Sequence, residues 1–219
     1  MGPRSRPLAP RARFITFEGG EGGGKTTQAQ RLREALQKHG LNVLVTREPG
    51  GAPGAEQIRK LLVAGAKDRW DPLAEAMLHF AARCEHVAKT IRPALAEGTW
   101  VLCDRFTDST MAYQGYAQGV GPAQIKRIAA AALGSFKPDL TLVLDLPVTL
   151  GLRREAARAG SVSEVRYSRM GLAFHRTVRS AFLEIAAGAP QRCAVVNARP
   201  SADTVQANIW TIVEERLLG

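Results

Sequence analysis

The sequence has 219 residues, of which 45% are hydrophobic and 23% charged, and its formal net charge at pH 7 is +10. This length suits one domain, or one domain with a small insert, that buries a full core. No apolar run reaches the roughly 18 residues that a membrane span needs, and we expect no membrane partner. The three cysteines, Cys84, Cys103 and Cys193, are far apart, which favours neither a disulfide framework nor a zinc site and indicates a reducing cytoplasm.

The first 13 residues form a basic segment with three prolines, four arginines and no apolar periodicity. We expect a disordered tail over residues 1–13 and a single domain over residues 14–219. The net charge at first suggests nucleic acid as a partner. However, much of the charge outside the tail lies where phosphates are expected below. A nucleotide substrate therefore explains the charge at least as well, and nucleic acid is not the expected partner.

The domain is predicted to open with a short apolar strand at residues 14–17, a glycine-rich turn and then a helix at residues 26–39. The turn matches the phosphate-binding pattern G-x-x-x-x-G-K-[ST]. Glycines let successive backbone N–H groups surround a phosphate, and the positive end of the helix faces the same group. The expected phosphate-binding residues are Gly19, Gly20, Glu21, Gly22, Gly23, Gly24, Lys25, Thr26 and Thr27.

A second strand is predicted at residues 41–46, which completes a strand–helix–strand unit and indicates a parallel sheet. The loop that follows, Arg47 to Gly54, is rich in proline and glycine. Because ligands of open α/β sheets bind at the carboxyl ends of strands, Arg47 is a candidate anion ligand. A short helix is predicted at residues 55–63. A long one is predicted at residues 71–97, with a kink near Pro93 and with His79 and Arg83 on one face.

The third predicted strand, residues 99–104, ends in Asp104, which Arg105 follows directly. A carboxylate at a strand end near a phosphate loop commonly holds Mg²⁺. Asp145, at the end of a fourth strand over residues 140–146, is the rival acid. We prefer Asp104 because Arg105 adds a phosphate-binding cation beside it.

The remaining segments are predicted to alternate as helices and strands. Helices are expected at residues 107–117, 122–133, 148–159, 164–187 and 202–218, and a fifth strand at residues 194–197. Residues 160–163 are small and polar, which suits a mobile lid. The pattern favours an α/β fold with a five-stranded parallel sheet flanked by helices.

Several stretches together resemble the bacterial thymidylate kinase family: FITFEGGEGGGKTTQ, TREPGGAPGAEQIR, FAARCEHV, IRPALAEGTWVLCDRFTDSTMAYQG and KPDLTLVLDLP. The phosphate loop is shared by many proteins, whereas the REPGG loop followed by the DRF…S…AYQG stretch is specific. The resemblance implies a three-layer nucleoside-monophosphate-kinase fold with a short lid at about residues 153–168. It also implies transfer of the γ-phosphoryl group of ATP to dTMP with Mg²⁺, in dTTP synthesis, by a cytoplasmic homodimer.

The resemblance implies a role for each matching residue. ATP would be bound by the loop and by Arg199, with Thr26 and Asp104 holding Mg²⁺. The residues that would bind dTMP are Glu21, Arg47, Pro49, His79, Arg83, Arg105, Ser109, Thr110, Tyr113 and Gln114. Lys25, Asp104 and Arg105 would act in catalysis, together with Arg154, Arg158 and Arg166 of the lid, where the bacterial type carries its transition-state arginine.

The chain departs from the family pattern in two places. A lid run that is often D-R-[YF]-E reads VRYS at residues 165–168, without either acid. The aromatic residue usually found four positions before Arg83 is His79, which we expect to lie against the base, while Phe80 faces the core. Two alternatives stay open: a kinase for another nucleoside or nucleotide, and a nucleotide-dependent nucleic-acid-binding ATPase that uses Asp145 and the basic tail.

Overall fold

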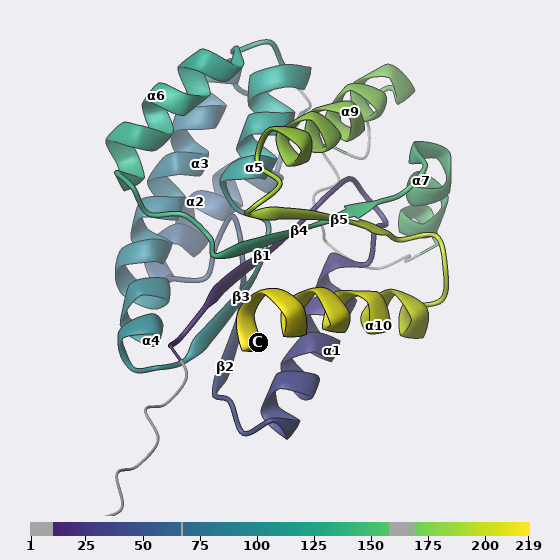
Figure 1. Ribbon diagram of the computed structural model, residues 1–219. Helices are drawn as coiled ribbons and strands as arrows, with labels where there is room; N and C mark the ends of the chain where they lie inside the picture. The colour runs from purple at the N-terminus through teal and green to yellow at the C-terminus, as the bar shows by residue number, and fades with distance from the viewer. Residues whose placement is uncertain (1–10, 67, 158–166, 168–169) are drawn as a thin grey trace, which may run out of the picture.

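The computed structural model describes residues 11–66, 68–157, 167 and 170–219. Its centre is a five-stranded sheet in the order β2-β3-β1-β4-β5, in which every neighbouring pair is parallel (Figure 1). The strands are β1 (Phe14–Glu18), β2 (Val43–Arg47), β3 (Trp100–Asp104), β4 (Leu140–Asp145) and β5 (Cys193–Asn197). The predicted parallel five-stranded α/β fold is therefore confirmed.

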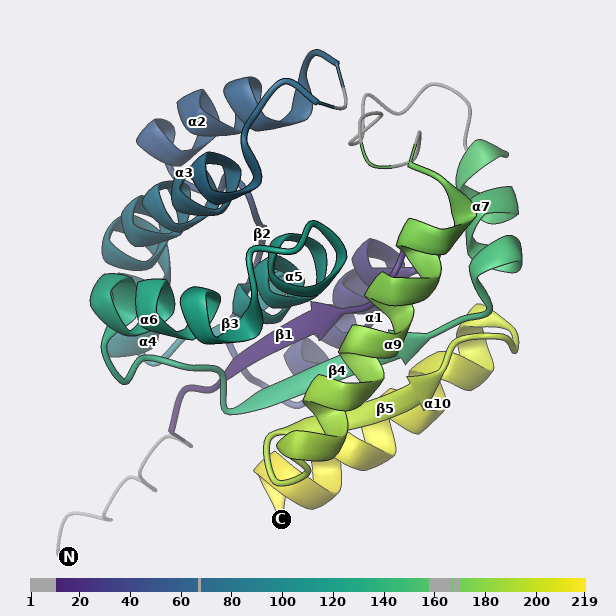
Figure 2. The same cartoon turned by 90° about the horizontal axis from the view of Figure 1, so that it is seen from above.

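Helices cover both faces of the sheet and complete three layers (Figures 1 and 2). One face packs against α1 (Lys25–Lys38) and α10 (Ala202–Val213), the latter continuing as η3 (Glu214–Leu218). The other face packs against α3 (Pro72–His86), α6 (Pro122–Leu133) and α9 (Leu172–Gly188), with α5 (Thr107–Thr110) and η2 (Met111–Ala117) between them. The outer helix α2 (Pro53–Val63) packs on α3, and α7 (Val148–Ala156) follows β4.

The carboxyl ends of the parallel strands meet at one edge of the sheet. Arg47 is in register with Asp104, which is in register with Phe17, while Glu18 is opposite Val143 of β4. The strand order reverses around β1, since β3 and β4 flank it on either side. This edge is where open α/β sheets bind their ligands, so polar strand ends brought together there are candidates for a site.

The long helix predicted over residues 71–97 is continuous but not regular. It runs as α3, a π-helical turn η1 (Val87–Ile91) and α4 (Arg92–Ala96). The N–H of Arg92 bonds to the carbonyl of Val87, five residues earlier. Pro93 has no N–H to continue the ordinary ladder, and a π turn next to a proline is a recognised cause of helix irregularity. The irregularity therefore begins one turn before the proline.

Of the helix predicted over residues 164–187, residues 164–166, 168 and 169 lie outside the described residues. Met170 and Gly171 are not helical, and α9 begins at Leu172. Gly171 sits at its N-cap in an extended conformation, and glycine disfavours a helix interior. At the other end of the chain, the carbonyl of Arg13 accepts a hydrogen bond from Val101, so ordered structure begins before the predicted boundary. Residues 1–10 lie outside the described part. Among the described residues, no helix is both long and apolar enough to span a membrane.

Candidate active site

The glycine-rich turn after β1 forms a compact loop whose shape requires glycine. Gly19 and Gly22 have φ angles of 126° and 67°. A Cβ atom would lie 2.5 Å from the Leu144 carbonyl oxygen at Gly19 and 2.1 Å from the Gly151 carbonyl oxygen at Gly22. The loop leads directly into α1 at Lys25, whose Nζ donates to the carbonyls of Gly19 (3.2 Å) and Gly20 (2.8 Å). A loop of N–H groups before a helix and a lysine folded over it suit an anion such as phosphate.

Thr26 and Asp104 lie together beside this loop, as predicted for a metal pair. The Thr26 hydroxyl donates to Oδ2 of Asp104 at 2.6 Å, joining the first turn of α1 to the end of β3. The rival acid, Asp145, instead accepts two hydrogen bonds from Arg179, at 2.7 and 2.8 Å. A hydroxyl and a carboxylate are hard oxygen ligands of the kind that Mg²⁺ takes beside nucleotide phosphates. The residues present therefore fit the ion.

Arg105 connects the phosphate loop to the neighbouring helix. Its backbone is left-handed, with φ of 70°, and its guanidinium donates to both carboxylate oxygens of Glu21 at 3.1 Å. The Tyr113 hydroxyl donates to the same carboxylate at 2.7 Å. Burial works to raise the pKa of Glu21, but Arg105, Lys25 and the Tyr113 hydrogen bond outweigh it and hold the pKa below its ordinary value. Glu21 is thus an ionised acid in a cationic site.

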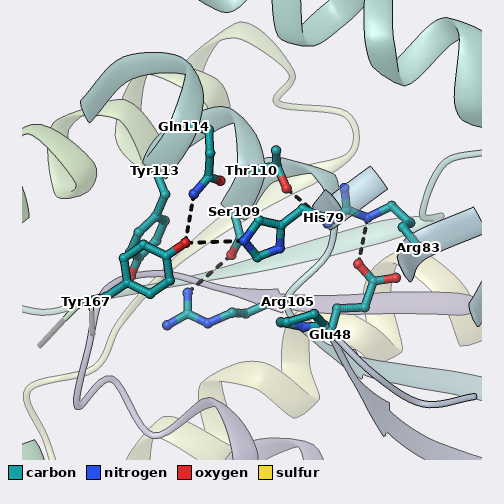
Figure 3. Close-up of a pocket in the computed structure, with 10 residues that line it drawn as sticks. Glu48, His79, Arg83, Arg105, Ser109, Thr110, Tyr113, Gln114 and Tyr167 are labelled. Carbon is teal, nitrogen blue, oxygen red and sulfur yellow. Dashed lines mark hydrogen bonds and ion pairs between the residues drawn. The ribbon is translucent and has the colours of Figure 1, made fainter. Parts of the chain in front are cut away.

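One pocket opens beside Arg105 and is called the main pocket here (Figure 3). Segments far apart in the sequence line it: the loop after β2, α3, the turn after β3, the helix α5–η2 and Tyr167. Its lining residues are Glu48, Pro49, His79, Arg83, Arg105, Ser109, Thr110, Tyr113, Gln114 and Tyr167. The lining includes every residue predicted to bind dTMP except Glu21 and Arg47. Glu21 joins it indirectly, through Arg105 and Tyr113.

Arg83 is a buried cation whose partners fix it at the wall of the main pocket. Its Nε donates to Glu48 at 2.6 Å, and Nη2 donates to the Phe106 carbonyl and the Thr110 hydroxyl at 3.0 and 3.1 Å (Figure 3). Both members of the ion pair are nearly inaccessible to water, with side-chain exposures of 2% and 3%. The remaining nitrogen, Nη1, is buried and has no hydrogen-bond partner among the described residues. A buried donor of this kind suits a carbonyl oxygen of a ligand.

His79 lines the main pocket one helical turn before Arg83, as the sequence predicts. Its Nε2 lies 3.3 Å from the Tyr167 hydroxyl, which also receives a hydrogen bond from Gln114 at 3.0 Å and donates to the buried carboxylate of Glu75 (Figure 3). Phe80 is 2% exposed and belongs to the core, which confirms its predicted orientation. Stacking of His79 on a base stays a prediction.

Five other predicted residues lie outside the main pocket or outside the described residues. Arg47 is exposed and paired with Glu56 at 3.1 Å. Arg154 donates to the carbonyls of Ala198 and Arg199, at 2.9 and 3.0 Å, which ties α7 to the loop after β5. Arg199 itself is exposed. Arg158 and Arg166 lie outside the described residues, so their predicted catalytic role stays a prediction.

Sequence reasoning missed three buried acids that organise the site. Glu48 neutralises Arg83, and Glu75 accepts hydrogen bonds from Gln114 at 2.7 Å and Gln118 at 3.1 Å. Glu18, at the end of β1, binds the turn after β3. An available signal was the assignment of Arg83 to the nucleotide site, since a cation that becomes buried requires a carboxylate nearby. Glu48 stands in a loop already assigned to the site and was the natural candidate.

Comparisons with known proteins agree with this geometry. The thymidylate kinase family model matches residues 17–209. The thymidylate kinase of Caulobacter vibrioides is 53% identical over 93% of this chain and 97% of its own length, and that of Afipia carboxidovorans 51% over 98% and 93%. The crystal structure of thymidylate kinase from Ehrlichia chaffeensis superposes with a TM-score of 0.76, at 33% identity, over 93% of this chain and all of that one. The chain belongs to the thymidylate kinase family, whose members are nucleoside monophosphate kinases.

Proposed function

We propose that the chain transfers the γ-phosphoryl group of ATP to dTMP, giving ADP and dTDP, in the synthesis of dTTP. The observation that carries the proposal is that Arg83 lines a pocket next to the phosphate loop and that its buried Nη1 has no hydrogen-bond partner among the described residues. Its N–H matches a pyrimidine carbonyl, as in thymine, and opposes the amino group that cytosine carries at the same place. The pocket thus supports a thymine-type acceptor over a cytosine-type one.

The chemistry requires positioning and positive charge more than covalent work by the protein. A phosphate oxygen of dTMP attacks the γ-phosphorus of ATP, and the bond to the bridging oxygen breaks as ADP leaves. Lys25 and the loop N–H groups bind the donor phosphates, while Arg105 faces the acceptor phosphate with Arg47 as its proposed partner. Thr26 and Asp104 would hold Mg²⁺, which when bound neutralises phosphate charge. Arg154, Arg158, Arg166 and Arg199 remain proposed contacts to ATP or to the transferring group.

A coupled assay of ADP formation tests the proposal, with dTMP, dUMP, dCMP and AMP as acceptors. We expect dTMP to be the best acceptor and dCMP and AMP to be poor ones. The Lys25→Ala variant, purified in the same way, controls for contaminating kinases. A preference for another nucleotide would overturn the assignment of dTMP. ATP hydrolysis that DNA stimulates and dTMP does not would favour the nucleic-acid-dependent ATPase instead.

We also propose a cytoplasmic homodimer. Three large apolar side chains, Leu61, Leu73 and Met77, are 38–58% exposed on the neighbouring helices α2 and α3, which supports a contact between copies there. All three cysteines are free thiols, which suits a reducing compartment. Light scattering during size-exclusion chromatography tests the dimer. Met77→Lys is expected to shift it toward the monomer, and an unchanged mass would exclude α3 from the contact.

A further inference from the structure

Glu18 is a buried acid at the site that the proposed chemistry does not use. It ends β1, is 0% exposed and lies directly before the phosphate loop, but it does not line the main pocket. Its carboxylate accepts three hydrogen bonds from one short segment. The donors are the backbone N–H groups of Phe106 (2.8 Å) and Ser109 (3.3 Å) and the Ser109 hydroxyl (2.5 Å).

These donors belong to the beginning of helix α5. Phe106 occupies the N-cap position, where a phenyl ring has no oxygen to accept a hydrogen bond from the first turn. Glu18 supplies the missing acceptor from a neighbouring strand, and its negative charge suits the positive end of a helix. The segment continues without a break into η2. Together α5 and η2 carry four residues of the main pocket: Ser109, Thr110, Tyr113 and Gln114.

The same carboxylate also holds Arg105 through Ser109. Nη1 of Arg105 donates to the Ser109 hydroxyl oxygen at 3.2 Å, and that hydroxyl donates to Glu18 (the former bond is drawn in Figure 3). Phe106, whose N–H Glu18 accepts, directly follows the left-handed Arg105. Glu18 therefore restrains both the backbone turn and the guanidinium of the cation that faces the acceptor phosphate.

We propose that Glu18 is a positioning residue. It holds the residues that bind the acceptor nucleotide in place and does not affect the residues that bind ATP. The inference rests on the proposed function, because it takes dTMP as the acceptor. Among the described residues, every hydrogen bond of the Glu18 side chain comes from the segment that begins at Phe106 and lines the main pocket. Lys25 and Thr26, on the donor side, are held by other groups.

The electrostatics of Glu18 provide a signature that a purely structural role lacks. Burial and then the charge of Asp108 raise its pKa to about 7, although the Ser109 hydrogen bond, Arg105 and the Phe106 N–H oppose the shift. Other ionisable groups also feel its charge, namely Cys103, Arg192 and Cys193. Above this pKa the full carboxylate caps the helix. Below it, the neutral carboxyl group resembles the amide of glutamine.

Glu18→Gln in the full-length protein tests the proposal, with KM for dTMP and for ATP measured from about pH 6 to about pH 8.5. At the alkaline end we expect KM for dTMP to rise about tenfold, as for one lost charge-assisted hydrogen bond, with KM for ATP within about twofold. The ratio of the variant's KM for dTMP to that of the parent should fall toward one at the acidic end. Taking this ratio cancels the ionisation of the dTMP phosphate itself.

Asp139→Asn is the matched control, because Asp139 also accepts a backbone N–H, from Phe14 at 2.8 Å, at the opposite edge of the sheet. It should lower the melting temperature without changing KM for dTMP.

If Glu18→Gln does not fold, Asp108→Asn keeps Glu18 and should move the midpoint of the pH dependence of KM for dTMP to lower pH. A ratio independent of pH, an equal rise in KM for ATP, or an unmoved midpoint in Asp108→Asn would overturn the inference. Failure of the parent protein to phosphorylate dTMP would overturn the proposed function instead.

Discussion

The phosphate loop and the main pocket meet at one edge of the sheet but are built in different ways. The loop is one continuous stretch whose backbone is proposed to bind the phosphates of ATP, and two of its glycines are required by close contacts with other backbone atoms. The pocket draws its lining from segments between residues 48 and 167 and depends on buried ion pairs such as Arg83 with Glu48. A contiguous motif carries its geometry in its spacing, whereas a composite pocket acquires its geometry only from the fold.

The largest effect is expected on the loop side, from Lys25→Ala. The substitution removes a charged donor from the transferring phosphoryl group, and losing one preorganised donor costs about 10²–10³ in kcat. The melting temperature should change little, because the Lys25 ammonium group donates to carbonyls of the adjacent loop and is not part of the hydrophobic core. Steady-state kinetics and thermal unfolding measure the two effects. Near-normal turnover in a folded variant would contradict the phosphate-loop assignment.

The next prediction is that the two arginines proposed to bind the acceptor phosphate differ in the size of their effect on KM for dTMP. Arg105→Ala should raise KM for dTMP more than KM for ATP, by the equivalent of about 1.5–3 kcal/mol, because Arg105 is buried and also neutralises Glu21. Arg47→Ala should act in the same direction but less, since Arg47 is exposed and must leave Glu56 to reach a ligand. Glu56→Gln tests this competition and should lower KM for dTMP slightly. A larger effect on KM for ATP in either alanine variant would mean that the two halves are assigned backwards.

A comparable effect is expected on stability, from the raised pKa of Glu18. The folded-state pKa is about 7, compared with 4.5 for the free group, so the folded protein binds more protons between these values. The contribution of Glu18 to stability is therefore fully present below about pH 4.5 and is lost as pH rises toward 7. Relative to Glu18→Gln, the parent should lose up to about 3 kcal/mol of unfolding free energy across this window, because each pKa unit is worth about 1.36 kcal/mol. Denaturant unfolding at several pH values measures this loss. A difference in unfolding free energy between parent and variant that does not change with pH would show that folding does not raise the pKa of Glu18.

Much of the fold follows from local patterns in the sequence. The parallel strands and α6 are found where apolar periodicity and turn residues predict them. The differences lie at local interruptions of helices. Pro93 predicts a kink, but it does not indicate that the irregularity is a π-helical turn that begins before the proline, and α9 begins only at Leu172, after Gly171. Propensity alone cannot select among helix types when tertiary packing overrides it.

The site shows the same division. The spacing of the phosphate-loop motif predicts where Lys25 and Thr26 stand relative to the loop backbone. Thr26 and Asp104, predicted as a pair, lie within hydrogen-bond distance of each other. No spacing indicates that Glu48, in a loop, neutralises Arg83 on a helix, or that Tyr167 reaches Glu75. These pairings join residues 35 and 92 positions apart. Buried polar groups select partners by three-dimensional proximity, which one sequence does not reveal.

The smallest effect concerns His79, for which the sequence and the structure predict opposing contributions. From the sequence alone, His79→Phe should lower KM for dTMP, because phenyl offers a larger surface and base stacking is worth about 1–3 kcal/mol. The structure adds an opposing contribution, since Nε2 of His79 lies 3.3 Å from the Tyr167 hydroxyl. Phenylalanine loses this hydrogen bond, which is worth about 0.5–1.5 kcal/mol. The two contributions largely cancel, so we expect KM for dTMP to fall only about twofold.

A double-mutant cycle with Tyr167→Phe separates stacking from hydrogen bonding at His79. Without the Tyr167 hydroxyl, His79→Phe has no hydrogen bond to lose there, so its benefit to dTMP binding should grow to about fivefold or more. KM for ATP serves as the internal control and should stay unchanged in all four proteins. His79→Ala should raise KM for dTMP in both backgrounds, because it removes the ring. Equal effects of His79→Phe in both backgrounds would show that the hydrogen bond contributes nothing. If all His79 variants match the parent, the base rests on another side chain and His79 serves only as part of the pocket wall.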